Sequence, residues 1–504
     1  MPVFLRPILD RGLCLQTHPS DSSRGAQFLR RPSGKGISNG KRSIHNPMAT
    51  QASKFSPARS LSSSYEEYVN PQWVALLNIL DMNVRYERCA GSELFTEDGR
   101  RILDFLSGYC VHNTGHNHPY IVQALKDELD KSGPAMLQSH VPEIAGELAK
   151  RLCQLAGGGL EKVYFGSSGS EGVEAAIKFA RASTGRAGIV YARSSFHGLT
   201  AGALSLMNDA FWREGFGPLL QDTVGVEYGD ASAIESALQG KRHAALVLEP
   251  VQSEAGIRVP SKAYLQKAQE LCRKTGTLFV IDEVQTGMFR TGTFLASHQF
   301  ELRPDIVILA KALSGGLIPV SAVLMTDKIY HAVYSSLRRA IVHTSTFSEN
   351  SLSMRAGLAS LDVLESQHLG PRAMELGETF RAKLRNALAP FEMVKEVRGM
   401  GLLSGIEFAA PKKMSLRVPF EAFHRIHPAM FGQIVVMRMF REKNILTQIC
   451  GNNFMVLKAA PPLVMKEEQL NEFVAAIRGV VELAHTSAAF WSEALGLARR
   501  AAKV

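Results

Sequence analysis

The sequence predicts an α/β protein in which a mostly parallel sheet is covered by helices on both faces. Short runs of Val, Ile, Leu, Phe and Ala recur at strand length, and their continuous apolar character is typical of strands buried on both faces. Segments with helical spacing of apolar residues separate these runs, which is the pattern of βαβ units. The main predicted strands lie at residues 162–165, 189–191, 245–248, 277–281, 306–310 and 320–325.

Composition and charge limit the classes of partner. The 504 residues allow roughly three domains, and a 45% hydrophobic and 21% charged composition is that of a globular protein. The net charge of +10 is concentrated in residues 1–60, which hold ten Lys or Arg and two Asp, so the rest carries 47 basic and 45 acidic residues. A nucleic-acid binder carries its basic excess on the folded domain, so we expect no nucleic-acid partner. No apolar run approaches the roughly 18 residues that span a bilayer, so we expect no membrane association.

Residues 1–60 resemble a cleavable organelle-targeting peptide. They are rich in Arg and Ser, poor in acids and lack an uninterrupted apolar core, which favours a mitochondrial over a secretory signal. A disordered tail, or a true start at Met48 and a cytoplasmic protein, are the alternatives. Six scattered cysteines with no CxxC pair indicate reduced thiols rather than a disulfide framework or zinc ribbon.

The segment before the first predicted strand offers one candidate residue and one candidate metal site. An amphipathic stretch opens residues 65–100, which end near a turn at 97–99. His116 and His118 lack a third ligand nearby, so we interpret them as part of a turn that leads into a helix at 120–131, and we expect no metal. Tyr109 lies in an irregular segment from which a phenol can reach a pocket, although a packed tyrosine is nearly as good an interpretation.

A small-residue loop follows the strand at 162–165. The loop GSSGS (166–170) precedes a helix from Glu171, because apolar residues then recur at positions 173, 176, 177 and 180. Unpaired N–H groups and the helix dipole make such a junction suitable for a phosphate. The loop matches neither GxGxxG nor a Walker sequence, and taken alone it is weak, since many helices start this way.

An acid and an amine follow two neighbouring predicted strands. Asp282 ends the run at 277–281, and Lys311 follows the run at 306–310. Ligands of open α/β sheets collect beyond the carboxyl ends of the strands. There a lysine can form a Schiff base with an aldehyde cofactor while an aspartate pairs with a protonated pyridine nitrogen. Phe196, after the strand at 189–191, can stack on a flat heterocycle, or simply pack in the core.

The composition shifts near residue 366. Hydroxyl residues at 344–346 precede a long apolar helix, and charged amphipathic segments then alternate with the strand pair VRGMGLLSGIEF and the segment FMVLKAAPPLV. We predict a tail or targeting peptide at 1–60, an N-terminal segment at 61–118, a large domain at 119–365 and a smaller domain at 366–504.

Five motifs occur in this chain at spacings that closely resemble one family. They are GSSGSEGVE, SFHG, EPVQSEAG, DEVQTGMFRTG and LAKALSGG. Over residues 65–480 the chain resembles the class III (ω-) aminotransferases, fold-type I pyridoxal 5'-phosphate enzymes such as ornithine, acetylornithine and putrescine aminotransferases. The resemblance implies a large domain with a mostly parallel seven-stranded sheet, a smaller α+β domain built from the C-terminal part and an N-terminal segment, and a homodimer with shared active sites. It also implies ping-pong transfer between a small-molecule amine donor and an oxo acceptor.

The resemblance also assigns roles to residues. Lys311 would bind the cofactor covalently and move a proton, and Asp282 would keep the pyridine nitrogen protonated. Contacts with the cofactor are implied for Gly169 and Ser170 at the phosphate, Phe196 and Val284 on the ring faces, Gln285 at the phenolic oxygen, Glu249 near the ring, and Ser345 and Thr346 at the phosphate of the neighbouring subunit. Substrate contacts are expected for Tyr109, Glu254 and Lys458.

Two departures from the family bear on the substrate. Lys458, in KAAPP, stands where relatives usually carry an arginine that clamps the substrate α-carboxylate, and a lysine cannot reproduce that two-pronged contact. Leu199 stands where ornithine aminotransferases carry a second arginine. Both weaken the assignment of ornithine and 2-oxoglutarate, and we favour a small diamine or basic amino acid reacting at its terminal amine. A decarboxylase or aminomutase on the same fold, and a non-catalytic cofactor-binding protein, are the alternatives.

Overall fold

The computed structural model describes residues 61–137, 139–426, 429–487 and 490–492. The predicted targeting peptide and Met48 lie outside the described residues. Within them, no helix combines the length and apolar character that crossing a membrane requires.

The largest sheet has seven strands, most of them parallel. Their order is β4-β10-β9-β8-β7-β5-β6, and only β10 runs antiparallel to its neighbours. This confirms the predicted α/β fold and the strands expected from the apolar runs. The edge strand β6 was not predicted, because only one of its four residues is buried and it has no apolar run. The strands are β4 (Lys162–Gly166), β5 (Gly188–Ala192), β6 (Thr223–Val226), β7 (His243–Leu248), β8 (Leu278–Asp282), β9 (Ile306–Leu309) and β10 (Ser321–Met325).

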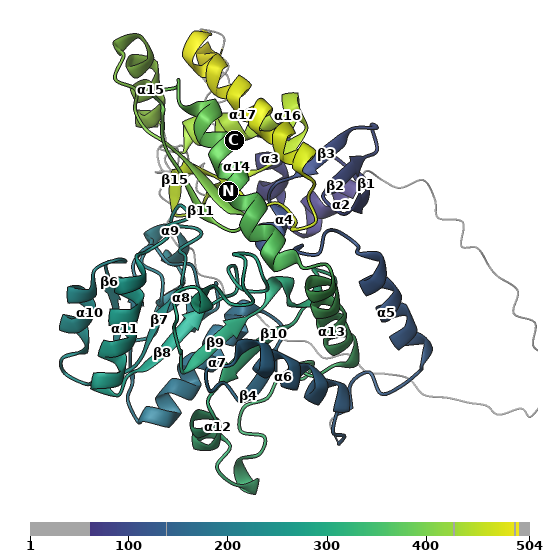
Figure 1. Cartoon of the computed structure of the whole chain (residues 1–504), viewed down its shortest axis with the longest axis vertical. Helices are drawn as coiled ribbons and strands as arrows, with labels where there is room; N and C mark the ends of the chain where they lie inside the picture. The colour runs from purple at the N-terminus through teal and green to yellow at the C-terminus, as the bar shows by residue number, and fades with distance from the viewer. Residues whose placement is uncertain (1–60, 138, 427–428, 488–489, 493–504) are drawn as a thin grey trace, which may run out of the picture.

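Helices cover both faces of this sheet, as alternation along the strands requires. Val280 of β8 packs in a cluster with α7, whereas its neighbours Phe279 and Ile281 pack in another cluster with α11. Successive side chains of a strand point to opposite faces, so both faces are apolar and both need a cover (Figure 1). The helices around this sheet include α5 (Pro119–Asp130), α6 (Glu143–Ala156), α7 (Gly169–Thr184), α8 (Ala201–Ser205), α9 (Ala210–Arg213), α10 (Ala231–Leu238), α11 (Lys262–Thr275), α12 (Asp327–Val333) and α13 (Ser351–Ser366).

Two four-stranded sheets lie at the other end of the molecule. One has the order β1-β2-β3-β13 and the other β11-β12-β15-β14. In the first, β13 pairs in parallel with β3, so a C-terminal segment completes an N-terminal sheet. The strands are β1 (Tyr86–Ala90), β2 (Glu93–Thr96), β3 (Arg101–Asp104), β11 (Val394–Met400), β12 (Leu403–Phe408), β13 (Ile445–Leu446), β14 (Gln448–Cys450) and β15 (Asn453–Ala459).

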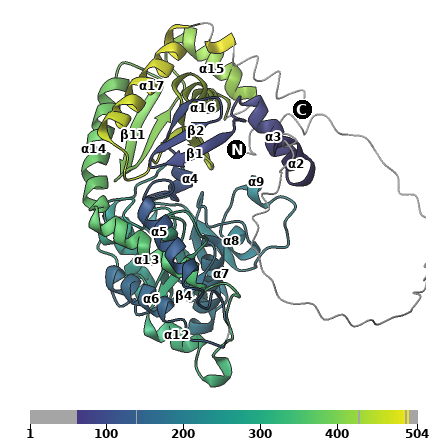
Figure 2. The same cartoon turned by 90° about the vertical axis from the view of Figure 1, so that its right-hand side faces the viewer.

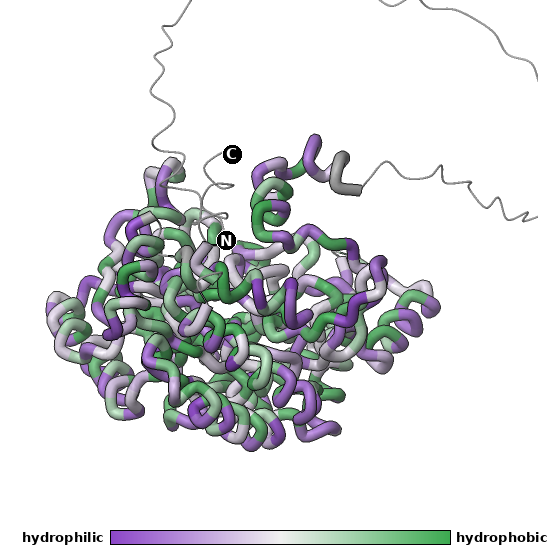
Figure 3. The backbone as a smooth tube through the Cα atoms, turned by 90° about the horizontal axis from the view of Figure 1, so that it is seen from above, coloured by the Kyte–Doolittle hydropathy of each residue, from purple (hydrophilic) through white to green (hydrophobic). Residues whose placement is uncertain are grey.

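Helices of the C-terminal part pack against these sheets. They are α14 (Leu369–Leu388), α15 (Met414–Ile426), α16 (Met430–Lys443) and α17 (Glu467–Thr486). Viewed from above, polar segments run along the outer edge of the chain trace and apolar segments are frequent inside it (Figure 3). The first two described helices, α2 (Leu61–Tyr68) and α3 (Pro71–Ile79), stand to one side of this body (Figure 2).

Candidate active site

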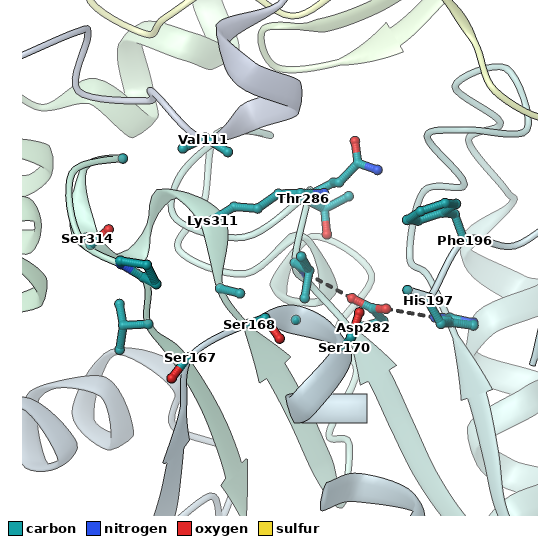
Figure 4. A pocket seen from close by; sticks show the side chains of 18 of the residues that line it. Val111, Ser167, Ser168, Ser170, Phe196, His197, Asp282, Thr286, Lys311 and Ser314 are labelled. Carbon is teal, nitrogen blue, oxygen red and sulfur yellow. Dashed lines mark hydrogen bonds and ion pairs between the residues drawn. The ribbon is translucent and has the colours of Figure 1, made fainter. Parts of the chain in front are cut away.

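The carboxyl ends of the central strands open into one cavity of about 390 Å³. Lys311 lies two residues after the end of β9, and Asp282 ends the adjacent parallel strand β8. Figure 4 shows both side chains entering the cavity, together with Ser170 of α7 and Phe196. The predicted residues that line it are Gly169, Ser170, Phe196, Glu249, Asp282, Val284, Gln285 and Lys311.

Lys311 is buried in a setting that favours its neutral amine form. It begins the short 3-10 helix η3 (Lys311–Ser314) with a left-handed φ of 50°, a strained conformation that is common at functional sites. Burial lowers the pKa of Lys311, and the neighbouring Cys110 and Glu254 oppose this effect only in part. Its Nζ makes no hydrogen bond to any residue that the structure describes. A neutral lysine amine, whose lone pair is free, is the form that adds to an aldehyde.

Asp282 is oriented by two partners from its own chain. Its Oδ2 lies 2.7 Å from Nδ1 of His197, which is fully buried, and its Oδ1 accepts a hydrogen bond of 3.0 Å from the amide of Val284. Burial opposes protonation of His197, but its hydrogen bond to Asp282 and the charges of Asp282 and Glu249 outweigh burial and raise its pKa. His197 was not among the predicted site residues, although its place beside Phe196 in SFHG was the signal that could have identified it.

Glu249 is a second buried carboxyl group beside this pair. Its Oε1 accepts a hydrogen bond of 3.1 Å from the amide of Phe196, which fixes the backbone that carries this aromatic ring. Burial raises the pKa of Glu249 to about 7, and the charge of His197 offsets only part of that rise. Glu249 therefore titrates near neutral pH.

Replacing Glu249 should change how stability depends on pH. A carboxyl group whose pKa is raised on folding favours the folded state below its unfolded pKa, near 4.5, and this contribution is lost as the pH rises to about 7. Glu249→Gln should therefore unfold like the wild type at pH 4.5 and gain up to about 3 kcal/mol over it at pH 8. Urea unfolding at both pH values measures the difference, with the exposed Glu87→Gln as control. A difference that stays constant with pH would contradict this prediction.

The N-terminus of α7 forms an anion-binding cradle. The helix begins at Gly169, two residues before the predicted start, because Ser168 and Glu171 form a reciprocal capping box. This leaves the amides of Gly169 and Ser170 without an acceptor among the described residues. Gly198, with φ of 120°, lets its loop approach closely, since a Cβ there would collide with the Ser170 side chain. Free N–H groups at a helix start bind phosphate well.

The three predicted substrate residues gather behind the cavity rather than lining it. The ammonium of Lys458 pairs with Oε1 of Glu254, and both residues are buried. Burial raises the pKa of Glu254, but the charge of Lys458 outweighs it and holds the value at about 2. Gln285 donates to the same carboxylate oxygen at 3.2 Å and connects the pair to the cavity. The Lys458 Nζ lies 5.1 Å from the centre of the Tyr109 ring, a cation–π distance.

Two of the predicted cofactor residues lie outside this cavity. Ser345 and Thr346 lie in the segment before α13, and neither lines this cavity. Thr346 is exposed, and its predicted contact with the cofactor of a neighbouring subunit stays a prediction. Nε2 of His116 lies 2.7 Å from Oδ2 of buried Asp104, and His118 precedes α5. Together, the cradle, the aromatic Phe196, the carboxylate of Asp282 and the amine of Lys311 suit a flat, phosphorylated aromatic aldehyde.

The comparisons with known proteins agree with this chemistry. The model of the family described as "Aminotransferase class-III" matches residues 78–481. Aminotransferase PigE of a Serratia species is 35% identical over 449 residues, which cover 83% of this chain but only 53% of PigE, so the chain spans about half of that relative. The mitochondrial ornithine aminotransferase of Drosophila melanogaster is 34% identical, with 85% of this chain and 94% of the relative covered. The crystal structure of ornithine aminotransferase from Toxoplasma gondii superposes with a TM-score of 0.73 at 28% identity, covering 84% and 94% of the two chains.

Proposed function

We propose a specific reaction for this chain, which belongs to the class III aminotransferase family. It moves an amino group from the terminal amine of ornithine, a diamine or a related basic amino acid to an oxo acid or aldehyde, by a ping-pong mechanism. One observation carries the proposal: the buried amine of Lys311 and the oriented carboxylate of Asp282 lie at the ends of neighbouring strands, facing the same cavity. Relatives named as putrescine, ornithine and acetylornithine aminotransferases support the donor class.

Class III aminotransferases use pyridoxal phosphate, and the cavity suits it. We propose that the amides of Gly169 and Ser170 hold its phosphate, that Phe196 and Val284 enclose its ring and that Gln285 lies at its phenolic oxygen. When bound, the cofactor supplies an aldehyde and an electron-withdrawing ring. Asp282, oriented by His197, holds a proton on the ring nitrogen. Lys311 provides the amine that binds the aldehyde and then moves a proton to and from the reacting carbon.

The Glu254–Lys458 pair supports a donor without a clamped α-carboxylate. Lys458 is fully buried and its charge is already paired with Glu254, so it presents no free cation to a substrate carboxylate. We propose that Tyr109 and Glu254 instead help to seat the distal end of the donor from behind the cavity, where Glu254 accepts a hydrogen bond from the lining residue Gln285. The acceptor is then an oxo acid or an aldehyde that does not depend on a two-pronged carboxylate clamp.

A panel of donors and acceptors tests the proposed reaction, with Lys458→Arg measured in parallel. We expect the wild type to accept amino groups from diamines or basic amino acids and to use 2-oxoglutarate poorly. Lys458→Arg should raise kcat/KM for 2-oxoglutarate by about tenfold, because a guanidinium adds a second hydrogen bond to a carboxylate. Lys412→Arg, an exposed site, is the control. If no amine discharges the cofactor, the proposal is wrong; carbon dioxide release, or nitrogen retained in the product, would indicate decarboxylation or amino-group migration.

We further propose that the active unit is a homodimer in which Thr346, with Ser345, reaches the cofactor phosphate of the other subunit. The segment before α13 exposes the apolar side chains of Leu337, Ile341 and Phe347, which a second copy would cover. Sedimentation equilibrium that gave a mass near 55 kDa, that of one chain, at micromolar concentration would contradict this proposal.

We also infer a mitochondrial location from the basic, acid-poor composition of residues 1–60. Fractionation of cells that express the full chain tests it. Recovery in the cytosol with residues 1–60 still attached would contradict it.

A further inference from the structure

Trp212 of α9 contacts the wall of the cavity without lining the cavity itself. Its indole meets the ring of Phe196 edge to face, with ring centres 5.5 Å apart and planes at 78°. Edge-to-face aromatic pairs restrict the orientation of both rings. The amide of Phe196 is already fixed by Glu249. Trp212 therefore supplies the side-chain restraint on the aromatic ring that faces the cavity.

The same indole binds a segment from the C-terminal sheet. Its Nε1 donates a hydrogen bond of 3.0 Å to Oδ1 of Asn452, which is 240 residues away in the sequence. Asn452 and Gly451 form the two-residue connection between β14 and β15, here called the hairpin tip. The Nδ2 group of Asn452 donates to the carbonyls of Ser194 and Ser195 at 2.9 and 3.2 Å, directly before Phe196. The hairpin tip is thus attached to the loop that carries the cavity ring.

The hairpin tip also binds Glu254. The amide of Gly451 donates to Oε2 of Glu254 at 2.9 Å, and the amide of Asn452 donates to its backbone carbonyl at 2.9 Å. A Cβ on Gly451 would lie 3.2 Å from Glu254 Oε2 and 3.7 Å from the Trp212 ring, so the tip packs closely between the two. The hairpin tip therefore contacts both Glu254, behind the cavity, and Trp212, which packs against the aromatic ring of the cavity wall.

We propose that Trp212 is a positioning residue of the aminotransferase site, which orients the Phe196 ring and, through Asn452, makes that orientation depend on docking of the hairpin tip. The inference rests on the proposed function, because Phe196 is expected to face the cofactor ring. Trp212 acts through Phe196 and touches no reacting atom. The hairpin tip thereby joins the C-terminal sheet to the geometry of the cavity.

A double-mutant cycle tests the coupling between the two residues. Trp212→Phe keeps an aromatic edge but removes the Nε1 donor, and Asn452→Ala removes the acceptor. We expect Trp212→Phe to lower kcat roughly fivefold to tenfold, the net value of one hydrogen bond. Asn452→Ala should lower kcat at least as much, because it also removes the hydrogen bonds to Ser194 and Ser195, and neither variant should change the KM for the amine. The double variant should be no slower than Asn452→Ala alone, since Asn452→Ala already removes the link that Trp212→Phe breaks. Trp73→Phe is the control: it makes the same substitution at a half-buried tryptophan of α3 and should leave kcat unchanged.

Two spectroscopic readouts separate positioning from general stability. The visible circular dichroism of bound cofactor should weaken in both single variants and not in Trp73→Phe, because it reports the asymmetric setting of the ring. In protein without cofactor, subtracting the fluorescence spectrum of Trp212→Phe from that of the wild type gives the emission of Trp212. The same subtraction of the double variant from Asn452→Ala should give an emission at longer wavelength.

The outcomes distinguish this inference from the proposed function. Additive losses in the cycle, or unchanged Trp212 emission in Asn452→Ala, would overturn the role of Trp212 and leave the transamination intact. A lower melting temperature with unchanged dichroism and kcat would also overturn it. Failure of the wild type to take up pyridoxal phosphate would overturn both.

Discussion

Lys311→Ala should abolish transamination, with kcat/KM reduced by at least about 10⁴-fold, the upper end of the contribution of a positioned acid–base group. The same side chain is expected to bind the cofactor and to move the proton, so its loss removes both contributions. It is buried, its pKa is lowered and its Nζ has no competing partner among the described residues. Activity with each donor of the panel measures the effect.

Covalent trapping gives a readout independent of the donor. Borohydride treatment of the wild type loaded with pyridoxal phosphate should leave a pyridoxyl group on the peptide that contains Lys311, and Lys311→Ala should lose this label. The exposed Lys150→Ala serves as control and should keep both label and activity. A label on another lysine, or full activity in Lys311→Ala, would refute the assignment.

Asp282→Asn should lower kcat by about 10²- to 10³-fold while cofactor binding persists. An amide keeps the shape of the carboxylate but removes its charge. The protonated ring nitrogen of the cofactor would then be a buried cation without a partner, which costs about 3–5 kcal/mol. His197→Asn should cost less, because it leaves the charge of Asp282 in place and removes only an orienting hydrogen bond. Single-turnover rates of the three proteins measure the order, and equal losses in both variants would contradict it.

In protein without cofactor, Asp282→Asn should also change how the free energy of unfolding depends on pH. Asp282 raises the pKa of His197 on folding. The stabilisation from this pair is therefore complete below the unfolded histidine value of about 6.5 and is lost as the pH rises through the raised value. Asp282→Asn should be most destabilised relative to the wild type below that pH, and the difference should narrow in alkaline solution. Urea unfolding across the pH range checks the direction.

Much of the fold was predictable because its signals are local. The runs at 277–281 and 306–310 became β8 and β9, adjacent and parallel as expected, since continuous apolar stretches are stable only when both faces are covered. Short, half-exposed β6 carries no such signal and was missed. The antiparallel direction of β10 could not be predicted either, because an apolar run does not indicate in which direction its strand crosses the sheet.

The site was predictable in part for the same reason. Lys311 and Asp282 follow strands whose ends must meet at one edge of a parallel sheet, so their proximity follows from the order of elements. The partner of Asp282 could not be inferred in this way. His197 follows a different strand, 85 residues earlier, and only packing decides that its ring faces this carboxylate.

The sequence by itself determined the α/β architecture, the amine and the acid of the site, and the loop that opens the anion-binding cradle. The tertiary structure alone decided that Glu254 and Lys458, 204 residues apart, neutralise each other behind the cavity, and that Asn452 holds Trp212 against its wall. Pattern and motif depend on neighbours along the chain. Burial, charge pairing and the pKa shifts that follow from them depend on neighbours in space, which exist only once the chain has packed.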